Sequence, residues 1–401
     1  MVITDRATAA VRAVHALTAR WAASADRGTV FSAAGVWPLL AFLADGAGGA
    51  ARAELEGAVG VPAGQAAFAA RELLGVMGSV PGLDSALGLW TDRAMELQEA
   101  WLSRLPAEYH GVLTTDLDAS QEALDAWAAK RTDGLVDRMP VTLTEDARMV
   151  LATAFALRTD WPRPFTEVMR RPDTGPWQGR TLLGLHRRSV RPDRVGVTST
   201  PEGHVTALRV PGDNGIDVHL LLGEDRMAPG QVLRAGIGVL EGTLAVTGGG
   251  RLPHGHVGPG LHVEQQPSLT PEPVTLDVTT VAFEVAADHD LLALHGLFGL
   301  TTARDDRQGH FPGISAAPLA IGAAGQSAVA EFGALGFRAA AVAAMMPVAA
   351  GGLPQYRYET TVVRAEFDRP FAFLAVHRET RLVLAAGWVT DPKPHPARGP
   401  R

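Results

Sequence analysis

The 401-residue sequence contains no cysteine, which excludes disulfide bonds, thiolate catalysis and cysteine-ligated metal sites. It also has very little lysine: Lys130 and Lys393 stand alone, and arginine supplies the remaining positive charge. No run of about 18 apolar residues occurs, so we expect no membrane span and no membrane partner. Residues 1–24 lack the apolar segment of a secretory signal, and we therefore expect a cytoplasmic protein.

Acidic residues outnumber basic ones, 43 to 36, which gives a net charge of −7 and a pI near 6.0. This balance argues against a nucleic-acid partner, which would need a basic surface. Hydrophobic residues make up 46% and charged residues 20% of the chain, as in an ordinary globular protein with a large core.

The motifs of common catalytic sites are missing too. The sequence has no Gly-x-Ser-x-Gly elbow, no phosphate-binding loop and no His-Glu-x-x-His zinc motif. His254 and His256, with His262 nearby, could offer imidazoles to a metal, but no carboxylate or cysteine completes a familiar ligand spacing. We interpret them as residues of a solvent-exposed loop, expect no metal site and no cofactor, and favour a non-enzymatic function.

Hydrophobic periodicity predicts a mixed chain that is helical mainly in its first third. The helices expected from spacing and boundary signals cover 11–21, 36–45, 50–59 and 97–105. Alternation predicts strands at 84–92, 205–210 and 216–222, the last two joined by a hairpin turn at 211–215. Residues 244–272 are rich in glycine and proline and predict a loop.

One stretch near the C-terminus has an ambivalent pattern. Residues 327–332 and 360–363 have strand character, and the roughly thirty residues between them form a long segment without a clear element, a kind that tends to be functional. At period two, one face of residues 337–346 is wholly apolar, and the only charge among these residues, Arg338, lies opposite. The apolar face consists of Phe337, Ala339, Ala341, Ala343 and Met345. Such a face suits a strand over a core, although alanine favours helix.

Two motifs in this region resemble those of the serpin family. The first, similar to the serpin hinge Gly-Thr-Glu-Ala-Ala-Ala, consists of Gly336, Phe337, Arg338, Ala339, Ala340 and Ala341. The second matches the C-terminal serpin signature at the family's spacing and consists of residues 367–373 with Thr380, Gly387, Val389 and Pro392. Weaker matches follow in the same order from about residue 28, among them Trp161 and Pro164-Phe165.

The resemblance implies a serpin fold of the mixed α/β class, with a large central β-sheet, further sheets, eight or nine helices and a long exposed reactive loop. It implies one domain over residues 1–392 and a disordered tail over 393–401. Residues 150–155 should lie in a sheet, 274–285 should form a strand, 291–299 a helix, and 371–376 a buried strand. With the arginine, alanine and glycine bias, it indicates a bacterial, actinobacterial-type serpin.

In the family, a polar cluster gates the opening of the central sheet. The corresponding positions here are Ser32, Gly35, Thr153 and Gln326, and three of these four differ from the family's Ser, Ser, Asn and His. The resemblance leaves two interpretations open. The gate has been lost, or it still works because threonine and glutamine can also form hydrogen bonds.

In the family, the loop is bait for a protease and inserts into the sheet after cleavage. Counting from Gly336 places the cleaved bond at Ala350-Gly351, which would suit an elastase-like or subtilisin-like serine protease. Counting back from the C-terminal signature gives a different position, because this loop is longer than usual. The alternative residues are Arg357, Tyr358 and Glu359, and Arg357 would suit a trypsin-like protease.

Two functions therefore stay open. The first is suicide inhibition of a serine protease by the loop 336–359, in a monomer without cofactors. The second is a non-inhibitory serpin fold used for ligand or protein binding, or for catalysis in a specialised metabolic pathway. The altered gate, the long loop and Phe337 in place of a small residue motivate the second, which predicts a concave polar pocket. The surviving alanine run favours the first.

Overall fold

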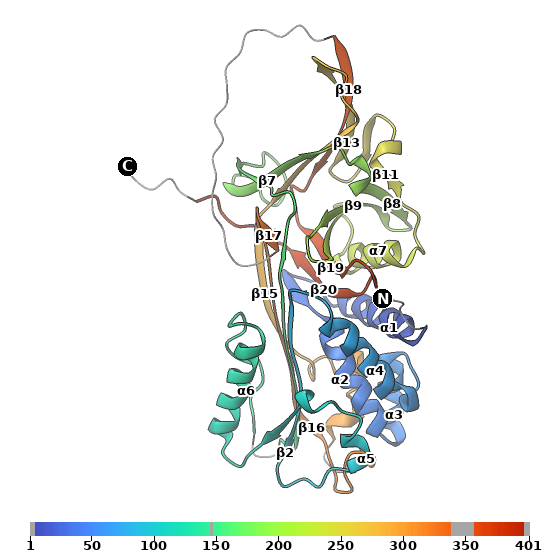
Figure 1. Cartoon of the computed structure of the whole chain (residues 1–401), viewed down its shortest axis with the longest axis vertical. Coiled ribbons are helices and arrows are strands. Elements are labelled where there is room, and N and C mark those ends of the chain that lie inside the picture. Colours follow the sequence, from blue (N-terminus) through green and yellow to red (C-terminus); the bar gives the residue numbers. More distant parts are fainter. Residues whose placement is uncertain (1–4, 145–146, 306, 338–356, 397–401) are drawn as a thin grey trace, which may run out of the picture.

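The structure is a computed structural model that describes residues 5–144, 147–305, 307–337 and 357–396. Within these residues it contains eight α-helices and four β-sheets of seven, six, five and two strands. Figure 1 shows an elongated molecule in which the five-stranded sheet runs along the lower half and most of the other strands occupy the upper half. The predicted mixed α/β class with a large central sheet and further sheets is confirmed, and the described residues contain the predicted number of helices.

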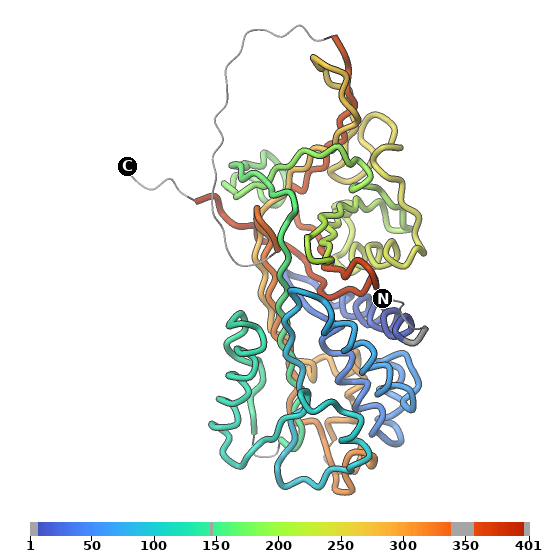
Figure 2. The backbone as a smooth tube through the Cα atoms, viewed as in Figure 1, coloured from blue at the N-terminus to red at the C-terminus, as the bar shows by residue number. Residues whose placement is uncertain are grey.

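The central sheet has the strand order β15-β16-β4-β2-β3. Its strands are β2 (Leu83–Asp92), β3 (His110–Leu113), β4 (Met149–Leu157), β15 (Phe283–Asp290) and β16 (Ile321–Phe332). Figure 2 shows these strands, drawn from distant parts of the chain, running side by side. Every residue of β4 is buried, as expected of a strand covered on both faces. The predicted strand at 150–155 is confirmed.

Helices cover one face of the central sheet. They are α1 (Asp5–Ala22), α2 (Ala33–Gly46), α3 (Gly49–Val59) and α4 (Ala63–Gly78). The residues of α2 are apolar on all sides and almost all buried, which is why this helix lies at the centre of the layer. The predicted helices at 11–21, 36–45 and 50–59 are confirmed.

Two predicted helices are shorter than expected. The segment 97–105 contains α5 (Glu99–Leu102), followed by η1 (Ala107–Tyr109), and the segment 291–299 contains α8 (His295–Phe298). The second shortens because Asp290 Oδ1 accepts hydrogen bonds from the backbone N–H groups of residues 292 and 293, which favours a turn over a helix. Gly299, with φ of 68°, then ends α8.

The opposite face of the central sheet carries α6 (Leu117–Arg131) and the chain that follows it (Figure 1). Asp116 caps this helix by accepting a hydrogen bond from Ala119 N at 3.0 Å. Only Ser120, Leu124 and Ala128 are buried among the helical residues. A small apolar cluster, separate from the main core, joins α6 to β2 and β4.

The seven-stranded sheet has the order β1-β20-β19-β10-β9-β8-β11, and α7 (Pro229–Glu241) packs on it. Its strands are β1 (Thr29–Phe31), β8 (Val195–Thr200), β9 (Gly203–Pro211), β10 (Ile216–Gly223), β11 (Thr247–Gly248), β19 (Phe371–His377) and β20 (Val383–Val389). The predicted hairpin is confirmed as β9–β10, and the predicted buried strand as β19, whose residues are all buried.

The six-stranded sheet has the order β12-β13-β18-β14-β7-β6. Its strands are β6 (Thr166–Arg170), β7 (Leu182–Ser189), β12 (Gly255–Gly258), β13 (Leu261–Ser268), β14 (Thr275–Val281) and β18 (Tyr358–Glu366). The prediction of a loop over 244–272 is wrong, because Leu261 and Val263 alternate with polar residues inside the glycine-rich stretch. The expected single strand at 274–285 is also wrong, because the chain passes at Ala282 from this sheet into β15.

The remaining elements are β5 (Thr159–Asp160) and β17 (Gly336–Phe337), which pair with each other, and η2 (Pro192–Arg194), η3 (Gly249–Arg251) and η4 (Thr302–Arg304). The C-terminal residues up to 396 join the fold. Lys393 N donates to Ala282 O at 2.8 Å, and its carbonyl accepts from Leu183 N at 2.9 Å. The prediction that a disordered tail begins at 393 is therefore wrong, because these backbone groups are paired; residues 397–401 lie outside the described part.

Candidate functional site

The first two residues of the predicted hinge, Gly336 and Phe337, are buried in the protein core. Gly336 and Phe337 form β17 and pair with β5. A Cβ atom at position 336 would lie 2.4 Å from the carbonyl oxygen of Thr159, so only glycine fits there. Phe337 is fully buried, with its ring 5.8 Å from that of Phe373 and 6.5 Å from that of Phe332. The other predicted site residues in this loop lie outside the described part: Arg338, Ala339, Ala340, Ala341, Ala350 and Gly351.

Residues 161–165 hold the chain just before the hinge. Trp161 N donates to Leu335 O and Phe165 N donates to Ala334 O, both at 2.8 Å. The Trp161 indole N–H donates to Gly333 O at 2.9 Å. Trp161 and Phe165 were singled out in the sequence only as family motifs. In the structure they fix the backbone from which the loop departs.

The four residues of the predicted gate cluster come together where the start of α2 packs on β4 and β16 of the central sheet. Gln326 Oε1 accepts from Ser32 N at 2.7 Å, and Gln326 Nε2 donates to Ser32 O at 2.9 Å and to Thr153 Oγ1 at 3.1 Å. Ser32 Oγ accepts from Gly35 N at 3.0 Å and donates to Leu384 O at 2.6 Å. These side chains are 0–1% exposed. A buried and fully hydrogen-bonded cluster costs free energy to open; its role as a gate stays a prediction.

The cluster lies at the pairing of β16 with β4. These strands are parallel, and Gln326 is the direct partner of Thr153. The hinge follows β16, so a loop that turned back at Gly336 would run antiparallel to both strands if it entered between them. Such an insertion would replace one parallel pairing by two antiparallel ones, which are slightly more stable per residue.

A closely packed segment covers this seam. The chain after α6 lies directly on β16, where a Cβ atom at Gly325 would come within 2.7 Å of Val141 Cγ1 and one at Gly322 within 2.8 Å of Ala147 Cα. Glycine at these two positions allows the close approach. The buried apolar cluster that joins α6 and the chain after it to β2 and β4 would have to shift for a strand to enter here.

A C-terminal clasp, consisting of Lys393, Glu284 and Glu331, crosses the top of β15 and β16. The two glutamates are direct cross-strand partners and would repel each other alone. Lys393 Nζ lies 2.9 Å from Glu284 and also pairs with Glu331. Burial lowers the pKa of Lys393, but the hydrogen bonds to both glutamates outweigh it and raise the pKa above its ordinary value. Sequence reasoning missed this clasp. The available signal was that Lys393, one of only two lysines in the chain, lies near its end.

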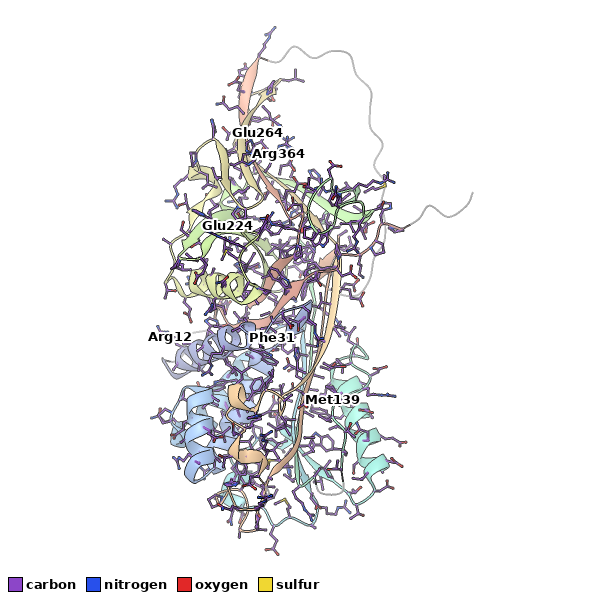
Figure 3. The ribbon with its side chains drawn as sticks, turned by 180° about the vertical axis from the view of Figure 1, so that it is seen from behind. Arg12, Phe31, Met139, Glu224, Glu264 and Arg364 are labelled. Carbon is purple, nitrogen blue, oxygen red and sulfur yellow. The ribbon has the colours of Figure 1, made fainter. Side chains whose placement is uncertain are left out.

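The far end of the loop is held in the middle of the six-stranded sheet. β18 pairs antiparallel with β13 along residues 358–365 and parallel with β14 along 362–366. Figure 3 shows Glu264 of β13 beside Arg364 of β18, and their side chains form an ion pair at 2.7 Å. Figure 1 shows β13 and β18 extending as a ribbon beyond the rest of the molecule.

The alternative scissile residues lie at the start of this ribbon. Arg357 is exposed, and its N–H donates to Ser268 O at 3.1 Å. Tyr358 and Glu359 already belong to β18 and pair with Ser268 and Pro267. A bond inside a paired strand is less available to a protease than one in an unpaired segment.

The interpretation of the histidines as loop residues is wrong for two of them, because His256 lies in β12 and His262 is its direct partner in β13. The rings of His256 and His262 are 4.5 Å apart, and His262 Nε2 is 3.7 Å from Glu264. The described residues contain no group of three or more side chains able to hold a metal ion. None of the described helices is both long and apolar enough to cross a membrane.

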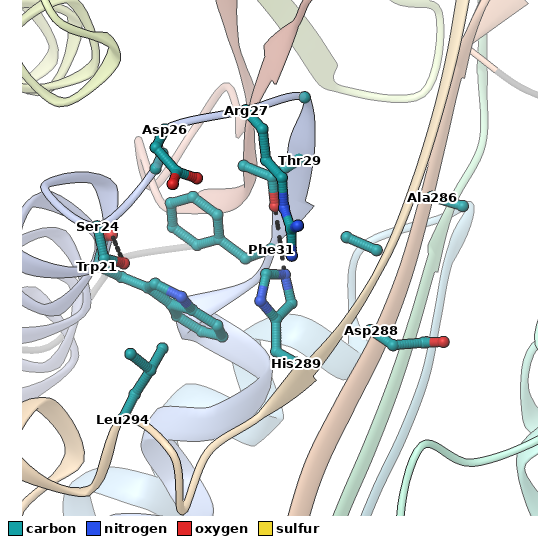
Figure 4. Close-up of a pocket in the computed structure, with 13 residues that line it drawn as sticks. Trp21, Ser24, Asp26, Arg27, Thr29, Phe31, Ala286, Asp288, His289 and Leu294 are labelled. Carbon is teal, nitrogen blue, oxygen red and sulfur yellow. Dashed lines mark hydrogen bonds between the residues drawn. The ribbon is translucent and has the colours of Figure 1, made fainter.

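A pocket of about 350 Å³ lies between the end of α1, the start of β1 and β15 (Figure 4). Trp21, Phe31 and His289 form its aromatic wall, with the His289 ring 5.1 Å from that of Trp21. His289 Nε2 lies 2.9 Å from Val30 O, and burial is the largest cause of its lowered pKa. A neutral His289 donates this N–H to Val30 and keeps a free acceptor at Nδ1.

Comparisons with known proteins agree with this architecture. A family model described as serpin (serine protease inhibitor) matches residues 7–174. The rice (Oryza sativa subsp. japonica) serpin-Z6A is 26% identical over 392 residues, covering 90% of this chain and 93% of its own. Rice serpin-Z6C is 24% identical over 399 residues, with 92% of each chain covered.

Solved structures also superpose on nearly the whole chain. The native thermophilic serpin tengpin gives a TM-score of 0.72 at 14% identity and covers 98% of this chain and 95% of its own. Human thyroxine-binding globulin complexed with thyroxine gives 0.70 at 17% identity, with 96% and 98% covered. Native protease nexin-1 with heparin gives 0.69 at 17% identity, with 96% and 99% covered. At these identities the superpositions show the fold.

Proposed function

The chain belongs to the serpin family, and we propose that it inhibits a serine protease as a suicide substrate, with residues 336–359 as the bait loop. The observation that carries the proposal is the parallel β4–β16 seam directly below Gly336. The loop's sequence offers an apolar face at period two for such a position, and the glycines of β16 allow the covering segment to approach the seam closely.

The reaction would proceed at the Ala350 carbonyl. The protease serine attacks this carbon, the bond to Gly351 nitrogen breaks, and an acyl-enzyme forms as the new amino terminus leaves. Insertion of residues 337–350 would then carry the attached protease away before water attacks the ester. We favour Ala350 over Tyr358 as the bait residue because Tyr358 is paired in β18. A small alanine suits elastase-like or subtilisin-like proteases.

The test is incubation with elastase-like, subtilisin-like and trypsin-like proteases, followed by denaturing gels and sequencing of the new amino terminus. We expect a complex that survives denaturation with one of the first two classes. Ala341→Glu, on the apolar face of the loop, should convert the inhibitor into a substrate. The matched variant Ala340→Glu, on the other face, should still form the complex. Digestion without a complex by all three classes would reject the proposal.

A second function is favoured by the aromatic pocket of Figure 4. Its volume and mixed lining suit a small aromatic ligand that hydrogen-bonds to His289. Thyroxine-binding globulin, which shares the fold, is a binding protein by name. A thermal-shift screen of aromatic acids and phenols would find such a ligand, and Ala287→Phe, which fills the pocket, should abolish the shift. A shift that persists in this variant would contradict binding here.

A further inference from the structure

A cluster of arginines gathers around β7 and β9. Figure 1 shows these strands in the upper half of the molecule. The members of this arginine cluster are Arg163, Arg187, Arg191, Arg194 and Arg209. They come from the segment before β6, from β7, from the turn after it including η2, and from β9. In a chain of net charge −7, such a local concentration of positive charge stands out and attracts anions.

The buried base of the cluster is Arg187. Its side chain stacks over the Phe165 ring at 4.1 Å and donates Nη1–H to Arg163 O at 2.9 Å, while only 8% of the residue is exposed. Burial, followed by the charges of Arg194 and Arg163, lowers the pKa of Arg187 to about 10. Burial and then Arg209, Arg163 and Arg191 lower the pKa of Arg194 as well.

The acidic side chains near the cluster do not neutralise it. Asp217 is held by Arg378, whose Nε and Nη2 donate to its Oδ1 at 3.0 and 2.6 Å, and is 4.0 Å from Arg209. Asp193 is exposed and lines the same pocket. Asp217 also acts electrostatically on Arg194, but no described carboxylate forms an ion pair within 4.0 Å of Arg191 or Arg194. Most of the positive charge is therefore left for a ligand.

A pocket of about 330 Å³ lies within the cluster, lined by residues 190–194 and Arg209. We propose that this pocket binds a compact oligophosphate anion through Arg191, Arg194 and Arg209. Guanidinium groups donate paired N–H bonds to phosphate oxygens, and several of them around one hollow match a group with several negative charges. The inference does not depend on whether the loop inhibits a protease.

Two sources could supply this chemistry, a free oligophosphate or the phosphate chain of a nucleotide. Calorimetric titration of the full chain with tripolyphosphate, inorganic phosphate and a nucleoside triphosphate separates them. We expect tripolyphosphate to bind at least about tenfold more tightly than inorganic phosphate, because it engages several arginines at once. A nucleoside triphosphate of equal affinity would identify the phosphates as the recognised part; a tighter one would identify the nucleotide as the source.

The variants Arg191→Gln and Arg194→Gln should each weaken tripolyphosphate binding about tenfold, the loss expected for one charge-assisted hydrogen bond. Arg188→Gln is the matched control, because this exposed residue of β7 points to the opposite face from Arg187. It should change the affinity by less than about twofold. Thermal melts verify that each variant is folded.

Unchanged binding in both Arg191→Gln and Arg194→Gln, or no heat with tripolyphosphate up to about 1 mM, the weakest affinity of interest, would overturn the proposal. A preference for duplex DNA over tripolyphosphate would also overturn it, because the ligand would then be an extended polymer on a basic surface rather than a compact anion in a pocket.

Discussion

At the scale of single residues, Phe337 decides how the loop starts. The sequence predicts that this large side chain hinders insertion. In the structure this second residue of the loop already lies in the core, among the rings of Phe332 and Phe373. Phe337 therefore stabilises the intact form and must be repacked, or kept in place, when the following residues move.

Phe337→Ala should lower the free energy of unfolding of the intact protein by about 3–5 kcal/mol, because it leaves a cavity among aromatic rings. Met169→Ala, at a residue that is 57% exposed, should change it by less than about 0.5 kcal/mol. Urea unfolding followed by tryptophan fluorescence measures both. Equal stabilities of the two variants would show that Phe337 does not anchor the hinge.

Gln326 is the second decisive residue. Gln326→Leu keeps the approximate size but leaves Ser32 N, Ser32 O and Thr153 Oγ1 without this partner, and should destabilise the protein by about 1–3 kcal/mol. Gly35→Ala is the control, since the added Cβ would sit 3.4 Å from Gln326 Nε2 and Ser32 Oγ and should change stability by less than about 1 kcal/mol. If Gln326→Leu does not change the stability, the gate cluster does not restrain the opening of the central sheet.

At the scale of elements, β13 changes how the loop's far end is held. Without it, β18 would be an edge strand paired only with β14; with it, β18 has neighbours on both sides. For an uncleaved loop to enter the central sheet fully, β18 would have to leave its own sheet. The paired β13 therefore opposes insertion before cleavage, while a cut at Ala350 would free the loop without moving β18.

Replacing residues 254–269 by a short Gly/Ser linker should accelerate amide hydrogen exchange in β18 by about tenfold or more, because one whole ladder of hydrogen bonds is lost. Glu264→Gln, which removes only the exposed ion pair with Arg364, should leave exchange nearly unchanged. Full protection of β18 in the linker variant would show that β14 alone fixes this strand.

At the scale of the whole molecule, a single cut should change stability in a direction that separates the two proposed functions. If cleavage between Ala350 and Gly351 lets the loop enter the seam, the new strand adds hydrogen bonds and buries its apolar face. The melting temperature should then rise by tens of degrees in scanning calorimetry. Ala341→Glu should abolish the rise and Ala340→Glu should keep it. An unchanged melting temperature after one verified cut would exclude suicide inhibition by loop insertion and leave the binding function as the proposal.

Acid should destabilise the folded protein through histidines that are buried or half-buried. Desolvation is the largest cause of the lowered pKa of His15, His110, His289 and His377, and it lowers the pKa of His219 to about 4. Such residues bind protons more readily when unfolded, so stability present above their unfolded pKa, about 6.5, is lost as the pH falls through the folded values. The melting temperature should drop from about pH 7 to about pH 5, and His219→Gln should flatten that dependence. A steeper dependence in this variant would contradict the assignment.

The sequence by itself determined the class of fold and the main elements. The apolar run of β4, the all-round hydrophobic α2 and the Asn-Gly hairpin before β10 each carry a local periodicity or turn chemistry that needs no tertiary contact to interpret. The resemblance in the hinge and C-terminal motifs supplied the family, and with it the four positions of the gate cluster.

Only the tertiary structure decided how these parts meet. The hydrogen bonds from Gln326 to Ser32 span 294 positions, and the clasp of Lys393 to Glu331 spans 62, so no local pattern reveals them. The strand β13 escaped prediction because glycines and prolines on both sides obscured a short alternation that becomes a strand only by pairing with β18. The arginine cluster likewise exists only because β7, η2 and β9 converge; electrostatics acts through space, whereas sequence patterns report neighbours along the chain.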